Sequence, residues 1–471
     1  MTLTPDDGPD ENARQRTRDQ YALLTEIHGE SLLIDTDDPA DFGFICRNDS
    51  VLVGRALRDG EDGEDPVTLL TDYLTNTRAG DFGPMPPQQE QSRTGLGRRF
   101  TLPARLNPSV DGRDLLATLA EIDAQFGPGF ATPDHLVHIC GKGLICPAAE
   151  PAETGDTLPF PYLSDDPDAG DGVDIVVIDT GWYDPSLGPQ ATAAATPWSW
   201  LSGVTGEPER LGVFEDPATQ LLYPYAGHGT FAAGVIRAVA PACRIHVLNL
   251  DVDQTVHGGG VHEADLVDRL YDALRDMEWL DEEDPRREDG HVWPDIISMS
   301  AGCPTRLDLP SVSFEHWGQD LAEKGADLVL VAAAGNNATA EGFWPASFDW
   351  ATGVGSVDRD GTISDFSNYG SSVDVLALGR DVINAFPNGT YKLREGIDKD
   401  KTRSFTNYMA TWSGTSFSTP LVTGLIAAEL SRQSGFRSAT QAQKDVLLAA
   451  TLYKAVDGAR SVPLVGSQFL Y

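Results

Sequence analysis

Ser416 is one of four polar side chains in the second part of the sequence whose types suit acyl transfer. It lies in GTSFSTP, residues 414–420, directly before the apolar run LVTGLIAAEL. A serine in such a place could simply cap a helix, because its oxygen can accept an orphan backbone N–H group. To act as a nucleophile it needs a base, and the base needs an acid that orients it.

The other three candidates follow short apolar runs or lie between glycines. Asp179 ends DIVVID, His228 lies in YAGHGTFAAGVI, and Asn336 follows LVLVAAAG. Taken singly, each has an ordinary role: a carboxylate that caps a turn, a satisfied polar group, and a Gly-Asn turn. Taken together they supply an oriented base and an amide donor for a developing oxyanion.

The order of these residues strengthens the chemical interpretation. The segments VIDTG, GHGTFAAG, AAAGNN and GTSFSTP closely resemble those of the subtilisin-like serine proteases, the subtilases, from residue 173 nearly to the C-terminus. The resemblance implies that Ser416 is the nucleophile, at the amino end of a helix beginning near Thr419. It further implies that His228 is the general base and Asp179 its orienting acid, and that Asn336 and the Ser416 N–H form the oxyanion hole.

Three positions depart from the usual pattern of that family. Phe231 stands where GHGTHVAG has a second histidine, and Phe417 and Leu421 replace the methionine and histidine of GTSMASPHVAG. None is a predicted triad member, so we expect altered packing around the site. No cofactor is expected in the chemistry. Structural calcium is compatible with the family, but no acidic segment has calcium-loop spacing, so no metal site is assigned.

The resemblance also implies how a peptide substrate would bind. Two segments of small residues would flank it as antiparallel strands, although loop flexibility is an alternative role for them. They comprise Gly258, Gly259 and Gly260, and Ser300, Ala301 and Gly302.

Phe343 precedes Trp344-Pro345, which resembles the aromatic-Pro step that in this family follows the floor of the pocket for the residue before the cleaved bond. Its ring would favour small substrate side chains there. The alternative is that the ring turns into the core.

The elements expected to position these residues alternate between strand and helix from residue 173 onward. The runs are VDIVVID, RIHVLNLDV, HEADLVDRLYDALRDM, PDIISMS, WGQDLAEKG, ADLVLVAAAG, WATGVGSVD and VDVLALG. Strands that are apolar throughout suit a sheet covered on both faces. We therefore expect an α/β fold with a subtilisin-like, mostly parallel sheet covered by helices on both faces. Reactive groups should gather at the carboxyl ends of its strands.

The first part of the chain has a different pattern. A helix is expected from Glu11 to Ile27, followed by strand-like runs and then a strand, helix, strand series ending in HLVHIC. We expect a smaller α+β region over residues 1–150, acting as a pro- or regulatory domain, a Pro- and Asp-rich linker over 151–172, and the catalytic domain over 173–471. His138, Cys140 and Cys146 could meet at a metal, but without the usual spacing of zinc ligands we favour ordinary buried residues.

The charge and cysteine content of the sequence limit the classes of partner that we expect for the protein. The 471 residues carry a net charge of −38, which argues against nucleic-acid binding. No signal peptide or membrane-length apolar run is visible, and five scattered cysteines do not form a disulfide framework. We expect a soluble cytoplasmic protein that acts on peptides or proteins, with no membrane partner and an oligomeric state that the sequence leaves open.

Two functions from different classes fit these observations. The first is a serine endopeptidase for intracellular protein degradation or for maturation of a dedicated peptide. The second is a catalytically silent, subtilase-like binding or regulatory protein, against which the intact set of four residues argues.

Overall fold

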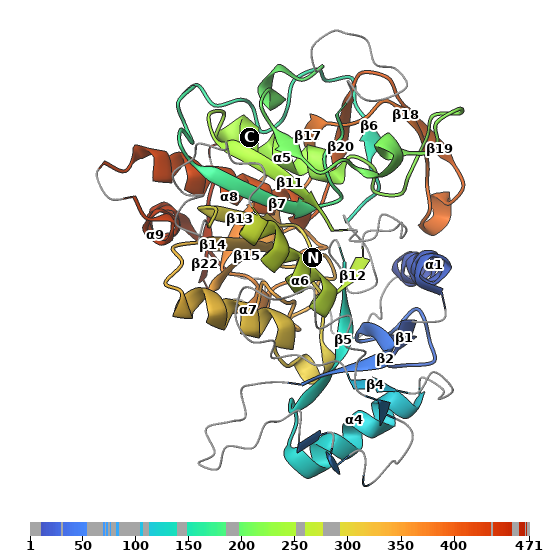
Figure 1. The fold of residues 1–471 in the computed structure, drawn as a ribbon. Coiled ribbons are helices and arrows are strands. Elements are labelled where there is room, and N and C mark those ends of the chain that lie inside the picture. Colours follow the sequence, from blue (N-terminus) through green and yellow to red (C-terminus); the bar gives the residue numbers. More distant parts are fainter. Residues whose placement is uncertain are drawn as a thin grey trace.

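A mostly parallel sheet lies at the centre of the C-terminal part in the computed structural model of the chain (Figure 1). The strand order is β21-β22-β16-β15-β14-β13-β7-β11-β8, and among these described strands only β21 runs antiparallel to its neighbour. The strands are β7 (Asp174–Asp179), β8 (Thr205–Gly206), β11 (Arg244–Asn249), β13 (Ile296–Met299), β14 (Val329–Ala333), β15 (Ala351–Val357), β16 (Val375–Leu378), β21 (Thr451–Lys454) and β22 (Ser461–Leu464).

The structure describes most but not all of the chain. The described residues are 11–29, 32–53, 113–138, 148–184, 197–250, 260–276, 293–434, 437–454, 461–466 and 468, with short pieces between 69 and 106.

Both faces of the sheet are covered, as the apolar strands predict. In β7, Ile175 and Val177 join a core with helices α5 (His228–Val239) and α8 (Thr415–Arg432). Val176 and Ile178 point to the other face, where α6 (Glu263–Asp276) and α7 (Val312–Glu323) close a second core. Alternate side chains of one strand thus serve two cores, because successive residues in a strand face opposite sides. The α/β architecture predicted for this part is confirmed.

Smaller elements surround this sheet. Helix α9 (Ala439–Ala449) packs on α8. One small sheet contains β17 (Val382–Ala385), β20 (Met409–Trp412) and β6 (Ala152–Glu153). Another contains β9 (Phe214–Asp216), β10 (Leu221–Leu222), β18 (Gly389–Lys392) and β19 (Thr402–Phe405). Short 3-10 turns lie at η3 (Ser199–Leu201), η4 (Arg210–Val213), η6 (Arg306–Asp308), η7 (Gly370–Ser372) and η8 (Gly396–Asp398).

The N-terminal region is α+β, as predicted. Its fully described helices are α1 (Glu11–His28) and α4 (Arg113–Phe126), and its described strands are β1 (Leu32–Ile34), β2 (Ile45–Val53), β3 (Phe82–Gly83), β4 (Ala104–Leu106) and β5 (Ala131–His138). The strands form an antiparallel sheet in the order β12-β5-β2-β4-β3, with β1 on β2. Its edge strand β12 (Gly260–His262) comes from the C-terminal part, so the sheet joins the two parts of the chain (Figure 1).

The start of the predicted linker over 151–172, with the two residues before it, lies against the C-terminal part. Strand β6 pairs with β20, and the indole N–H of Trp412 donates to the Ala149 carbonyl at 2.6 Å. Arg403 donates to the carbonyls of Glu150 and Pro151 at 3.1 and 2.6 Å. Residues 149–153 are therefore held by hydrogen bonds. No described helix combines the length and the apolar composition that a bilayer crossing requires.

Candidate active site

Asp179 and His228 meet as a buried pair at the carboxyl edge of the sheet. Asp179 is the last residue of β7 and His228 the first of α5, and neither side chain is exposed to solvent. Nδ1 of His228 lies 2.7 Å from Oδ1 of Asp179, which also accepts the Thr180 N–H at 2.7 Å. An ionised carboxylate only accepts hydrogen bonds, so with Asp179 ionised Nδ1 carries the proton and Nε2 is the basic nitrogen.

The turn before His228 has left-handed backbone at two residues. Tyr225 has φ 62° and Gly227 has φ 78°, and the His228 N–H donates to the Tyr225 carbonyl at 3.1 Å. Gly227 is required there because a Cβ would lie 2.4 Å from Cδ of Pro387. A left-handed tyrosine is disfavoured, so its surroundings must hold it in place.

Two buried glutamates hold this turn. The Gly227 N–H donates to both carboxylate oxygens of Glu209, at 2.8 and 3.1 Å. The Tyr225 hydroxyl donates to Oε1 of Glu395 at 3.1 Å. Burial raises the pKa of both carboxyls above their usual range. The position of His228 thus depends on two acids distant in sequence.

An aromatic cluster packs on the His228 ring. The ring centroid of Trp412 lies 5.3 Å away, nearly perpendicular, and that of Phe417 lies 5.2 Å away. Phe231 contacts both of these rings at centroid distances of 5.7 and 4.6 Å. Two of the departures from the family pattern therefore pack together beside the imidazole, and Leu421 is buried in the same core.

Helix α8 begins at Thr415, four residues before the start expected near Thr419, and so Ser416 lies within its first turn. The prediction placed Pro420 near the helix start, where proline is common, but it lies inside the helix. Proline lacks an N–H, so it cannot donate to the Ser416 carbonyl four residues earlier. The hydroxyl of Ser300 donates to that carbonyl instead, at 2.9 Å.

Asn336 lies three residues after β14 and contacts the start of α8. Its Oδ1 accepts the N–H and the hydroxyl of Thr415 at 2.8 and 3.0 Å. Because the Thr415 N–H can only donate, this atom must be the amide oxygen. The Nδ2 atom is buried and has no hydrogen-bond partner among the described residues. The amide is fixed at its oxygen and retains unused donors next to Ser416.

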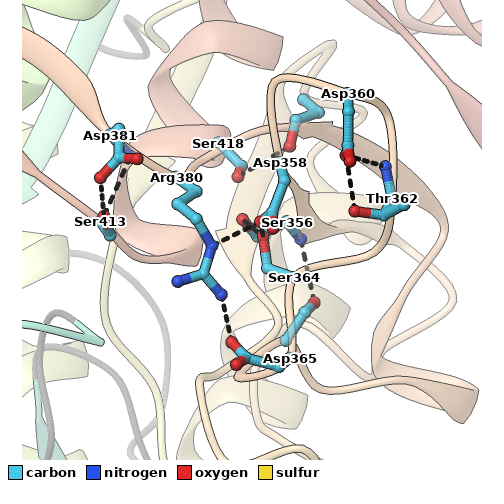
Figure 2. A network of polar contacts seen from close by, with 12 residues as sticks. Ser356, Asp358, Asp360, Thr362, Ser364, Asp365, Arg380, Asp381, Ser413 and Ser418 are labelled. Atoms are coloured by element: carbon cyan, nitrogen blue, oxygen red, sulfur yellow. Dashed lines mark hydrogen bonds and ion pairs between the residues drawn. The ribbon is translucent and has the colours of Figure 1, made fainter. Parts of the chain in front are cut away.

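Polar contacts fasten the chain just before α8, as Figure 2 shows. The Asp381 N–H donates to the Ser413 hydroxyl at 3.0 Å. The neighbouring Arg380 donates from Nε to Asp358 at 2.6 Å, and its Nη2 pairs with Asp365. This network ties the segment after β16 both to the loop after β15 and to the approach to Ser416.

The predicted substrate-binding segments contact the chain's own N-terminal region. Gly260 begins β12, which pairs antiparallel with β5. Gly302 exchanges two hydrogen bonds with His138 at the end of β5, at 2.9 and 3.1 Å. Ser300 and Ala301 are buried beside this contact, whereas Gly258 and Gly259 lie outside the described residues. Strand β5 thus pairs with residues 260–262, and its last residue also contacts Gly302.

The ring of Phe343 is buried between two glycines. A Cβ on Gly302 would lie 2.4 Å from its Cε1, and a Cβ on Gly335 would lie 3.2 Å from its Cγ. The Phe343 N–H donates to the hydroxyls of Ser347 and Ser372 at 2.9 and 2.8 Å. The ring therefore separates the residue 302 segment from the loop that carries Asn336.

No group of three or more histidine, cysteine, aspartate or glutamate side chains in the described part of the chain could hold a metal ion. Cys140 and Cys146 lie outside the described residues. The expectations about metal and calcium stay predictions.

Comparison with known proteins gives the family. The sequence profile of the subtilase family matches residues 170–463. An "Intracellular serine protease" of Paenibacillus polymyxa is 27% identical over 319 residues, which cover 64% of this chain and 79% of that protein. "Subtilisin BL" of Lederbergia lenta is 28% identical over 55% of this chain and 76% of that protein. Among solved structures, the prenylagaramide maturation protease PagA is 23% identical over 65% of this chain and 95% of that chain, with a TM-score of 0.43. The chain belongs to the subtilase family and is a subtilisin-like serine protease.

Sequence reasoning missed some residues around the site. Nothing in the sequence links Glu209 or Glu395 to the turn before His228, because neither lies in a recognisable motif. Ser300 was proposed only as a substrate contact. A signal for its other role did exist, since a proline inside α8 leaves the Ser416 carbonyl in need of a donor.

Proposed function

We propose that the protein hydrolyses peptide bonds with Ser416 as nucleophile, His228 as general base and Asp179 as the acid that orients His228. The buried contact of 2.7 Å between Nδ1 of His228 and Asp179 is the observation that carries this proposal. Nε2 would accept the Ser416 proton as the hydroxyl attacks the carbonyl carbon, and would then return it to the leaving amine. The Asp179 carboxylate would stabilise the imidazolium formed between these steps.

The developing oxyanion would be bound by Asn336 and by the backbone N–H of Ser416. The unpartnered, buried Nδ2 of Asn336 supports this role. Its amide is already oriented by Thr415, so little rearrangement would accompany the reaction. Donors fixed in advance are the most effective means of stabilising such charge.

A peptide substrate would bind as an antiparallel strand along residues 260–262 and 300–302. Support comes from the chain itself, because β5 makes these backbone contacts. Substrate and β5 would then compete for the same edges. The N-terminal region would accordingly limit access to the site, in keeping with the predicted pro- or regulatory domain.

Phe343 would restrict the side chain before the cleaved bond. Its ring lies between Gly302 and Gly335, close to the proposed substrate strand and the proposed oxyanion hole. A large substrate side chain would have to displace it, and overfilling a packed apolar site costs about 1–3 kcal/mol. We infer a preference for small side chains at that position.

The biological role would be intracellular protein degradation or maturation of a dedicated peptide. The name of the Paenibacillus polymyxa relative supports an intracellular setting. Peptide libraries derived from a proteome would distinguish the two roles, with Ser416→Ala as the control. Cleavage at many unrelated sequences favours degradation, and cleavage at one motif favours maturation.

A fluorophosphonate probe tests the chemistry and the catalytically silent alternative together. The parent protein should label at Ser416 and hydrolyse peptides, and Ser416→Ala should do neither while remaining folded. Asp179→Asn should lower kcat by about 10⁴, because the imidazole would adopt the wrong tautomer. Near-normal turnover in either variant would refute the assignment of these residues.

A further inference from the structure

We propose that helix α1 positions the proposed catalytic histidine, acting through an ion pair between Arg16 and Glu395. This inference rests on the proposed function, because it assigns the N-terminal region a second action on the same site. Strand β5 would compete with peptide substrates at that site, whereas α1 would support it.

The first contact in this connection lies between α1 and the segment around η8. Arg16 donates to Oε2 of Glu395 from Nη2 at 3.0 Å and from Nε at 3.3 Å, and from Nη1 to the Ala148 carbonyl at 2.9 Å. The Glu395 side chain is only 3% exposed. One turn along α1, Asp19 accepts from Lys399 at 2.8 Å and from the Gly396 N–H at 3.1 Å. Helix α1 is thus docked beside the turn that follows β18 (Figure 1).

The second contact joins Glu395 to the turn before His228. While Oε2 accepts from Arg16, Oε1 accepts the Tyr225 hydroxyl at 3.1 Å. Tyr225 is the left-handed residue with φ 62°, and its carbonyl accepts the His228 N–H. One carboxylate therefore binds α1 with one oxygen and the histidine-bearing turn with the other.

The negative charge of the buried Glu395 side chain makes its contact with Tyr225 depend on Arg16. Glu395 is almost entirely buried and lies near a second carboxyl, that of Glu150. A buried carboxylate is stable only when it is paired and hydrogen-bonded. Without the guanidinium, Glu395 would have to take up a proton or move toward water, and either change alters its hold on Tyr225. The strained turn could then relax and shift the imidazole.

Arg16 and Tyr225 are accordingly positioning residues, because neither needs to touch substrate. Small displacements of a catalytic group can have large effects, since about 1 Å can cost a factor of 10² in rate. Loss of the Arg16 contact leaves the other support of the turn, the hydrogen bonds from Gly227 to the Glu209 carboxylate, in place. We therefore expect the turn to move by less than about 1 Å. We expect a loss of about tenfold in the reactivity of Ser416.

The test uses the full-length chain and a small fluorophosphonate, with its maximal labelling rate and its apparent affinity measured separately. Arg16→Met should lower the maximal rate about tenfold and leave the affinity unchanged. Adding Glu395→Gln should restore most of the rate, because a neutral amide needs no cation and its oxygen can still accept from Tyr225. Arg14→Met is the matched control, since it removes another α1 ion pair, the more exposed one to Asp38.

Tyr225→Phe tests the same connection from its other end. It keeps the inference testable even if the Arg16 variant fails to fold. It leaves the ion pair intact and should lower the maximal rate by a similar factor. Combining it with Arg16→Met should add little, because both changes interrupt one connection. Parent-like rates in both single variants, or a faster rate in Arg16→Met, would overturn the inference. A parent protein that does not label would instead overturn the proposed function, and this inference with it.

Discussion

Replacing His138 with glutamine should make the attachment of β5 less sensitive to acid. His138 ends β5 and exchanges two backbone hydrogen bonds with Gly302. Its ring is buried 6.4 Å from that of Phe343, and its Nδ1 has no partner in the described part of the chain. Burial lowers the pKa of this imidazole from 6.5 to about 4. The attached strand therefore favours the neutral ring.

The size of the effect follows from the two pKa values. Well above pH 6.5 the ring is neutral whether β5 is attached or released, and its contribution to attachment is fully present. As the pH falls from 6.5 toward 4, only the released strand can take up the proton, so attachment weakens. At pH 5, about 1.5 pH units below the pKa of the released ring, protonation favours the released strand by about 2 kcal/mol, a shift of roughly 30-fold in the attachment equilibrium.

Hydrogen exchange at the Gly302 N–H would measure this shift, because that N–H donates to the His138 carbonyl. Both proteins would also carry Ser416→Ala, so that neither can cleave β5 by its own proteolytic activity. After correction for intrinsic exchange rates, protection should fall about 20-fold more between pH 7 and pH 5 in the parent than in His138→Gln, because at pH 7 the released ring is already partly protonated. His246→Gln is the control, since that ring lies on β11 and pairs with Thr205. Equal losses of protection in the parent and His138→Gln would refute the reasoning.

Three further predictions concern the proposed active site. Asn336→Ala should lower kcat by about 10²–10³, the loss known for the oxyanion-hole asparagine of subtilisin itself. Asn337→Ala is the control, and an equal loss of kcat in that variant would indicate general disruption of the loop. Ser300→Ala should reduce the free energy of unfolding by about 0.5–1.5 kcal/mol, because it removes the buried hydrogen bond from the Ser300 hydroxyl to the Ser416 carbonyl. Adding Pro420→Ala should recover part of this loss in denaturant titrations by restoring an N–H donor, and no recovery would contradict that account. Phe343→Gly should extend peptide cleavage to Phe and Leu before the cleaved bond, whereas an unchanged profile would place the ring outside the pocket.

The sequence predicted the framework of the C-terminal part because its strands are apolar throughout. DIVVID has no polar face, and such a run suits a strand that is covered on both sides. The contact between Asp179 and His228 was anticipated from motif resemblance, not from spacing, since 49 residues separate the two. Local pattern predicts an element well, but it cannot predict which distant element a side chain will contact.

The contacts that hold the site were less accessible to sequence reasoning. Glu395 lies in an irregular segment, and its partners Arg16 and Tyr225 are 379 and 170 residues away. The start of α8 was misplaced because proline usually marks a helix beginning. Here Ser300 compensates for the donor that Pro420 lacks, and the helix starts earlier. A donor supplied by a residue far away in the sequence cannot be seen in a local pattern.

The shared sheet of β5 and β12 also bears on how the chain is synthesised. Strand β5 ends at His138, and its partner β12 begins only at Gly260. At about 5–20 residues per second, the ribosome needs roughly 6–25 s to make the chain between them. Throughout that interval one side of β5 has unpaired backbone groups, which can recruit another nascent chain. Expression yield should therefore depend on chaperones that shield β5 until residues 260–262 emerge.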